Sequence, residues 1–154
     1  MAFGKILMIL GGLITIVATY VFAFYELIPA TLYGWGIGAW AFVPDVFASG
    51  EIMLILIEIF IILFLLAGVI QLIGLKSRVV GLIGSLLALG GFIYFMLIEF
   101  SLISSTAIYA LLFAGVPIGP LPIHVGVGSF ASLGAYLLAG GAVLGIIGTF
   151  VGRE

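Results

Sequence analysis

The stretch EIMLILIEIFIILFLLAGVIQLIGL, residues 51–75, decides the fold class. It is apolar over a length that crosses a bilayer as one helix, which takes about 20 residues. Glu51 opens the stretch and Glu58 lies inside it, while Lys76 and Arg78 follow directly after it. We therefore predict a membrane span over residues 51–75 with one carboxyl group buried in it.

The composition agrees with a membrane protein. Of the 154 residues, 66% are hydrophobic and 6% are charged, whereas a soluble domain carries about 25% charged residues. The four Lys and Arg residues are too few for a nucleic-acid groove. The absence of Cys excludes disulfides and thiolate metal sites. Asn is absent too. Thermophile proteins contain few Asn and Cys residues, so an archaeal source is one hypothesis. The other is that membrane chains are generally poor in Asn.

Three more apolar stretches predict three more spans. The N-terminal run begins like a signal peptide, but its apolar residues continue to Leu27, so we expect a retained span. Segments rich in Pro and Gly predict two outer loops, and residues 101–114 in the second have helical spacing but are too short to span, as in an interfacial helix. The expected fold is an all-α membrane protein, a single four-helix (tetraspan) domain over residues 1–154. Its predicted spans are residues 4–26, 51–75, 79–99 and 129–150.

The charged residues divide between the two sides of this layout. The basic side holds Lys5, Lys76, Arg78 and Arg153. The acidic side holds Glu26, Asp45, Glu51 and Glu99. The positive-inside rule then predicts that both termini and the turn at residues 76–78 are cytoplasmic, in the cell membrane.

Glu58 is the sharpest candidate for chemistry. It lies two helical turns past Glu51, about 10 Å deeper in the membrane. A charge at depth costs about 3 kcal/mol or more, so this side chain should face protein or water. The tyrosines expected at a comparable depth are Tyr20, Tyr94 and Tyr136.

A glutamate among phenols has two interpretations. It is either a titrating proton or cation site, or a neutral acid that locks the bundle by a hydrogen bond to a Tyr or a carbonyl. We favour the structural interpretation because a transport path needs further polar steps. The inner half offers only Thr15, Gln71, Ser85 and Thr149.

Two further sets of residues predict contacts. Small residues at four-residue spacing let helices approach closely, within the bundle or between subunits. They are Gly84, Ala88, Ala131, Ala135, Gly141 and Gly145. The outer loops are almost free of ionisable groups, and we expect other protein to cover them. Their expected contact residues are Trp35, Trp40, Phe113, Pro117, Pro120 and Pro122.

No catalytic pattern stands beside these features. His124 is the only histidine and has no Cys or second His to complete a metal or haem site. Residues 126–131 match the dinucleotide fingerprint formally, but no strand precedes them and no acidic residue follows at the required distance. We expect neither an enzyme nor a bound cofactor.

The layout resembles the broad tetraspan class that includes claudin-like proteins, with a larger first outer loop that holds Trp and a short inner turn. Gly38-Ala39-Trp40 is similar to their Gly-Leu-Trp element, but the paired loop cysteines of that class are absent. The resemblance implies a shared architecture and assigns no residue roles.

Three functions remain open from the sequence. The first is a non-catalytic tetraspan that assembles laterally, as a structural or accessory subunit of a homo-oligomer or a larger membrane complex. The second is a small proton or cation channel or carrier centred on Glu58. The third is an accessory subunit of a respiratory or other energy-converting complex. In each case the partners are the lipid bilayer and copies of the chain or other membrane subunits.

The predicted topology is tested with single cysteines at Ser77 and Ser49, since the chain has none of its own. We expect an impermeant thiol reagent to label the Ser49 position from outside and the Ser77 position only after the membrane is opened. Labelling of both positions from outside would contradict the four-span layout.

Overall fold

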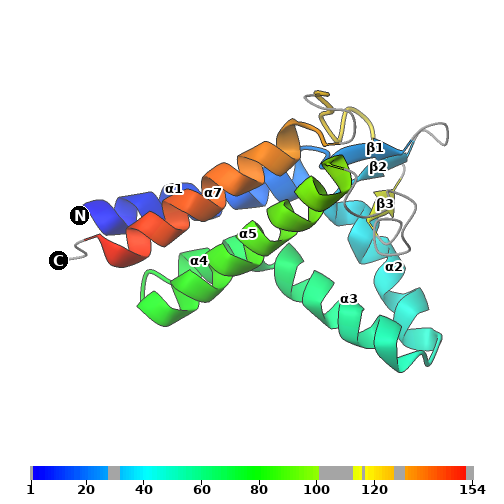
Figure 1. The fold of residues 1–154 in the computed structure, drawn as a ribbon, viewed down its shortest axis with the longest axis horizontal. Coiled ribbons are helices and arrows are strands. Elements are labelled where there is room, and N and C mark those ends of the chain that lie inside the picture. Colours follow the sequence, from blue (N-terminus) through cyan, green and yellow to red (C-terminus); the bar gives the residue numbers. More distant parts are fainter. Residues whose placement is uncertain (1, 28–31, 101–112, 116, 127–130, 152–154) are drawn as a thin grey trace.

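The structure is a computed structural model, and it describes residues 2–27, 32–100, 113–115, 117–126 and 131–151 (Figure 1). Helices dominate these residues. In chain order the elements are α1 (Phe3–Tyr20), β1 (Tyr25–Leu27), β2 (Leu32–Gly34), α2 (Gly36–Ala48), α3 (Ile52–Leu65), α4 (Ala67–Ile73), α5 (Arg78–Glu99), β3 (Ala114–Gly115) and α7 (Leu133–Phe150). In the described ranges, α1, α5 and α7 are long and apolar enough to cross a membrane, and α3 with α4 makes a fourth candidate. The fold is that of an all-α membrane protein with a small sheet added.

The bundle consists of α1, α4, α5 and α7. Helix α7 packs along α1 and α5, and α4 packs against the other side of α1 and α5 (Figure 1). The start of α1, the end of α7 and the turn between α4 and α5 lie at one end of the molecule, and the sheet lies at the other. Lys5, Lys76 and Arg78 therefore share one end, while Arg153 lies outside the described residues. That this end faces the cytoplasm stays a prediction.

Glycines let α1 and α7 approach each other closely. A Cβ added at Gly11 of α1 would lie 2.7 Å from the carbonyl oxygen of Gly141 on α7. One added at Gly148 of α7 would lie 2.7 Å from the carbonyl oxygen of Gly4. Helices α1 and α7 thus meet backbone to backbone, the arrangement that small residues allow in membranes.

The second span is not one straight helix, as the sequence predicted, but two. Helix α3 ends at Leu65, α4 begins at Ala67, and the two are bent by 54°. The backbone bonds around the break run from Leu66 N–H to Ile62 O and from Ile70 N–H to Leu66 O. The carbonyl of Leu65 accepts the hydroxyl of Tyr20 instead, at 2.8 Å. A side chain inserted into the helical ladder is a known cause of sharp kinks.

The first span is shorter than predicted. Helix α1 ends at Tyr20, and residues predicted to continue it form β1. This strand pairs antiparallel with β2, Glu26 opposite Tyr33, and β2 pairs antiparallel with β3, Tyr33 opposite Gly115. Aromatic residues suit a strand, and here the paired strands form a cap over the end of the bundle. The fourth span begins at Leu133, and residues 129–130 of the predicted span lie outside the described part.

The first outer loop also differs from the prediction, because most of it is the helix α2. Its Gly residues and the internal Pro44 disfavour a helix on propensity. Tertiary packing overrides this preference: a Cβ at Gly38 would lie 2.6 Å from the carbonyl oxygen of Phe113, so α2 rests directly on the segment leading into β3. Helices α2 and α3 form a hairpin that leaves the bundle (Figure 1). The predicted interfacial helix at residues 101–114 falls mainly outside the described residues.

Candidate functional site

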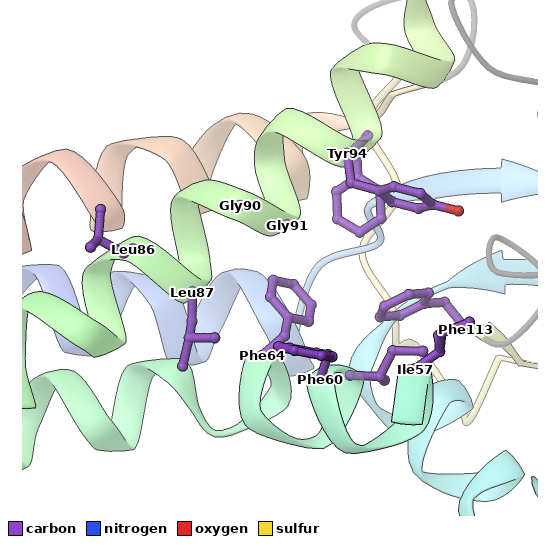
Figure 2. Close-up of a pocket in the computed structure, with 11 residues that line it drawn as sticks. Ile57, Phe60, Phe64, Leu86, Leu87, Gly90, Gly91, Tyr94 and Phe113 are labelled. Carbon is purple, nitrogen blue, oxygen red and sulfur yellow. The ribbon is translucent and has the colours of Figure 1, made fainter. Parts of the chain in front are cut away.

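The bend at Leu66 turns α3 away from α5 and opens a cleft between them, which we call the α3–α5 cleft. Its volume is about 330 Å³ and its lining is almost wholly apolar. Side chains of α3 and α5 face each other across it, with Phe113 at one end (Figure 2). Lining residues include Ile57, Phe60, Phe64, Leu87, Gly90 and Phe113.

Four phenylalanines hold the parts of the chain around this cleft together. Phe24 stacks on Phe95 with ring centroids 4.8 Å apart, and Phe113 lies 5.7 Å from Phe95 and 5.8 Å from Phe64. These rings come from four segments: the approach to β1, the end of α3, the outer part of α5 and the approach to β3. The sequence predictions included only Phe113 of the four, because 13 phenylalanines are scattered along the chain without a distinguishing period.

Tyr20 is the polar link at the bend. Its hydroxyl donates to the carbonyl of Leu65 and accepts the indole N–H of Trp40 at 2.9 Å. Three segments, α1, α2 and the α3–α4 break, are thereby joined at one oxygen atom. The sequence predicted Tyr20 as a partner of Glu58 and Trp40 as a contact to other protein, whereas both side chains serve this internal link.

Glu58 lies on the face of α3 that also carries Ile61 and Leu65, and its side chain is completely buried. Both carboxyl oxygens lack a hydrogen-bond partner among the described residues, so the expected bond to a tyrosine or a carbonyl is not found there. The carboxyl group is therefore buried without a hydrogen bond to the described residues. Whether it titrates stays a prediction.

The two other predicted tyrosines lie on α7 and α5. Tyr136 is partly exposed on α7, with its ring 6.0 Å from that of Phe92. Tyr94 lines the α3–α5 cleft and lies near Tyr25 in the cap. Burial, and secondarily the nearby Tyr94 hydroxyl, raise the pKa of Tyr25 well above 10.0, so Tyr25 remains neutral at physiological pH. The structure does not gather the three predicted phenols around Glu58.

A second polar cluster lies in the bundle core. The Gln71 side chain of α4 donates to the hydroxyl of Ser85 and to the carbonyl of Gly141, both at 3.1 Å, so it joins α4, α5 and α7. Ser85 donates in turn to the carbonyl of Gly81 at 2.8 Å. A Cβ at Gly145 would overlap the Gln71 and Ser85 side chains, so glycine there makes room for the cluster. The sequence signal was the single Gln inside an apolar helix, which must find partners in lipid.

The predicted helix-packing residues all pack inside the chain. A Cβ at Gly84 would lie 2.6 Å from the backbone nitrogen of Gln71, and Gly141 lies against the Thr15 side chain of α1. Ala88, Ala131 and Ala135 are buried. The Ala131 amide also donates to the Glu99 carboxylate at 2.7 Å, which ties α5 to the start of α7. These surfaces are thus occupied within one chain.

The predicted outer-loop contacts are largely used internally as well. Trp35 and Phe113 are buried by the chain itself, and Pro122 is buried too. Pro117 and Pro120 are exposed. The expectation that another protein covers the aromatic residues of the loops is therefore wrong for Trp35 and Phe113, because the cap covers them.

His124 pairs with Glu26 of β1, with 3.6 Å between Nε2 and Oε2, and its ring lies 5.5 Å from that of Tyr33. The contact fastens the Pro-rich segment to the sheet. Across the described ranges no three His, Cys, Asp or Glu side chains come together as a metal site.

No known protein family, curated protein or solved structure matches the chain.

The Tyr20 link predicts a specific stability effect. Tyr20→Phe removes one hydroxyl and leaves the Leu65 carbonyl and the Trp40 N–H without it, so we expect a loss of about 1–3 kcal/mol in unfolding free energy. Thermal unfolding in detergent measures it. Tyr136→Phe is the matched control, since that tyrosine is partly exposed on α7, and it should unfold like the parent. Equal stability of both variants and the parent would show that the link does not support the bend.

Proposed function

We propose that this chain is a non-catalytic integral membrane protein that assembles laterally, with copies of itself or within a larger membrane complex, through helix α3. The complete helices α1, α5 and α7 each expose one narrow stripe, as expected for helices that face lipid on one side. Helix α3 exposes two adjacent stripes, and this is the observation that carries the proposal. The stripes consist of Ile52, Leu56, Ile59 and Leu63, and of Met53 and Phe60.

Lateral assembly in a bilayer needs more than apolar surface, because lipid tails are as apolar as leucine. It is driven by close packing, and α3 packs sparsely within the described part of its own chain: its contacts with α2, α5 and α4 are each far sparser than those between α1 and α7. The small residues first expected to mediate assembly are occupied inside the bundle. The contact surface proposed here is therefore α3, which replaces the glycine faces and the buried loop aromatics.

The test compares two pairs of equally exposed residues. Leu56 and Ile59 on α3 are 50% and 42% exposed, and Val143 and Ile147 on α7 are 47% and 43% exposed. Replacing the α3 pair by Ala should weaken association roughly tenfold, about 1.4 kcal/mol. Replacing the α7 pair should leave it unchanged. Blue-native electrophoresis and energy transfer between labelled chains in liposomes measure association.

A parent protein that runs as a clean monomer after mild extraction would contradict the proposal. So would equal effects of the two pairs, because the surface would then be general rather than specific to α3. Mass spectrometry of proteins that co-purify separates self-assembly from membership in a larger complex, including an energy-converting one.

A second candidate function, a proton or cation carrier, is supported by one observation. The Glu58 carboxyl is buried in an apolar setting with no hydrogen-bond partner among the described residues. Ionisable groups within spans are functional by default. Against this candidate, the α3–α5 cleft beside the same helix is lined by apolar side chains and offers no polar route.

Variants at Glu58 separate the two functions. Glu58→Leu should raise the unfolding temperature in detergent, since it removes a buried polar group whose desolvation costs about 1–3 kcal/mol. Proton flux into liposomes should be absent from the parent and from Glu58→Gln. Suppose instead that the parent shows a proton flux, that Glu58→Gln abolishes it, and that Glu51→Gln, a change at an exposed residue, keeps it. The second function would then replace the first.

A further inference from the structure

We propose that the α3–α5 cleft is a binding site for one hydrocarbon chain of a bilayer lipid. The cleft is formed by two membrane-spanning elements, and its lining is almost wholly apolar. The medium that meets such a cleft in the membrane is hydrocarbon. The cleft shares Phe60 with the α3 surface proposed for lateral assembly, but Leu56 and Ile59, whose replacement tests assembly, are not among its lining residues, so the two proposals can fail separately.

The shape of the cleft suits a thin chain. It encloses about 330 Å³ between the side chains of α3 and α5. An extended alkyl chain adapts to a narrow space between two side-chain walls. A helix of a second copy is the alternative occupant, and the test below distinguishes the two.

Two adjacent glycines on α5 shape one wall, and they differ in what requires them. A Cβ at Gly91 would overlap the ring of Phe64, so close packing explains this glycine. A Cβ at Gly90 would have no atom within 4 Å, so the protein's own packing does not require glycine there. A glycine within a helix is unfavourable relative to alanine, and at Gly90 its effect is to leave the cleft open. Figure 2 labels both glycines on α5, across the cleft from the α3 side chains.

The chemistry of the lining selects the occupant further. Phe60, Phe64 and Leu87 offer rings and methyl groups but neither charge nor a strong hydrogen-bond donor. Apart from the Tyr94 hydroxyl, a headgroup has nothing to bind in this lining, so recognition is of the hydrocarbon part. Ligand sites lined in this way owe affinity to shape and apolar contact.

The test uses the full chain in phosphatidylcholine vesicles that contain a phosphatidylcholine with a photoactivatable diazirine in one acyl chain. After irradiation, peptides with lipid adducts are mapped by mass spectrometry. We expect adducts at Phe60 and Leu87 to exceed those at the lipid-facing Val143 and Ile147 of α7 several-fold. Gly90→Leu should lower the cleft adducts several-fold by filling the space, and Gly90→Ala should lower them less.

The control is Gly140→Leu on α7, where an added Cβ likewise meets no atom within 4 Å but lies outside the cleft. It should leave the adducts at Phe60 and Leu87 unchanged. Cleft adducts no more frequent than those on α7, or equally frequent in Gly90→Leu, would overturn the proposal. The proposal would also be overturned if the cleft carried no lipid adducts and the parent formed a dimer that Gly90→Leu dissociates. The occupant of the cleft would then be a second copy of the chain.

Discussion

The hydroxyl of Tyr20 on the carbonyl of Leu65 is the interaction on which the shape of this protein depends. In hydrocarbon, each backbone polar group needs a partner, so a transmembrane helix can break only where something else satisfies the freed groups. Tyr20 supplies that partner and is itself held by the Trp40 indole. With the break, α4 packs into the bundle while α3 turns away from it by 54°. The α3–α5 cleft and the wide exposed surface of α3 both follow from this bend.

The end of α3 next to the bend is also tied to the cap. Four phenylalanine rings have centroids 4.8 to 6.2 Å apart, those of Phe24, Phe64, Phe95 and Phe113. Edge-to-face and stacked ring pairs attract each other at this spacing. They connect the end of α3 to the sheet and to α5. Since α2 rests on the segment leading into β3, the hairpin of α2 and α3 is anchored at both of its ends. The cap is therefore the part of the fold that ties α3 to α5 at the Phe113 end of the cleft.

Hydropathy predicted how many apolar segments there are and roughly where they lie, because length and polarity alone decide whether a helix suits a bilayer. It missed the break, since Leu65, Leu66 and Ala67 contain no Pro or Gly and the cause lies in a distant segment at Tyr20. It missed α2 for the same kind of reason, because the packing of Gly38 on Phe113 outweighs local propensity. The sequence of one segment does not show which side chain of a distant segment will pack against it.

The predicted ring of phenols around Glu58 shows a different limit. Depth along each helix placed Tyr20, Tyr94 and Tyr136 in one layer, but depth says nothing about rotation about the helix axis. Tyr136 sits on the exposed stripe of α7. Tyr20 turns to the backbone at the bend. Only a second constraint on helix rotation, such as the Gly141 and Gly145 face that fixes α7 against α1, would have shown which tyrosines point inward.

The two buried polar groups, Gln71 and Glu58, lie in parts of the protein that differ in how densely the helices pack. Gln71 of α4 bonds to Ser85 of α5 and to Gly141 of α7 and so links three helices, at a place where Gly145 has no room for a Cβ. Glu58 sits on α3, which has few contacts with the other described helices, and its carboxyl oxygens have no partner among the described residues. A lipid chain, a neighbouring subunit or a proton alters the energy of this protein most where its own contacts are fewest. Helix α3 is that place, and for this reason each function proposed for the chain acts through it.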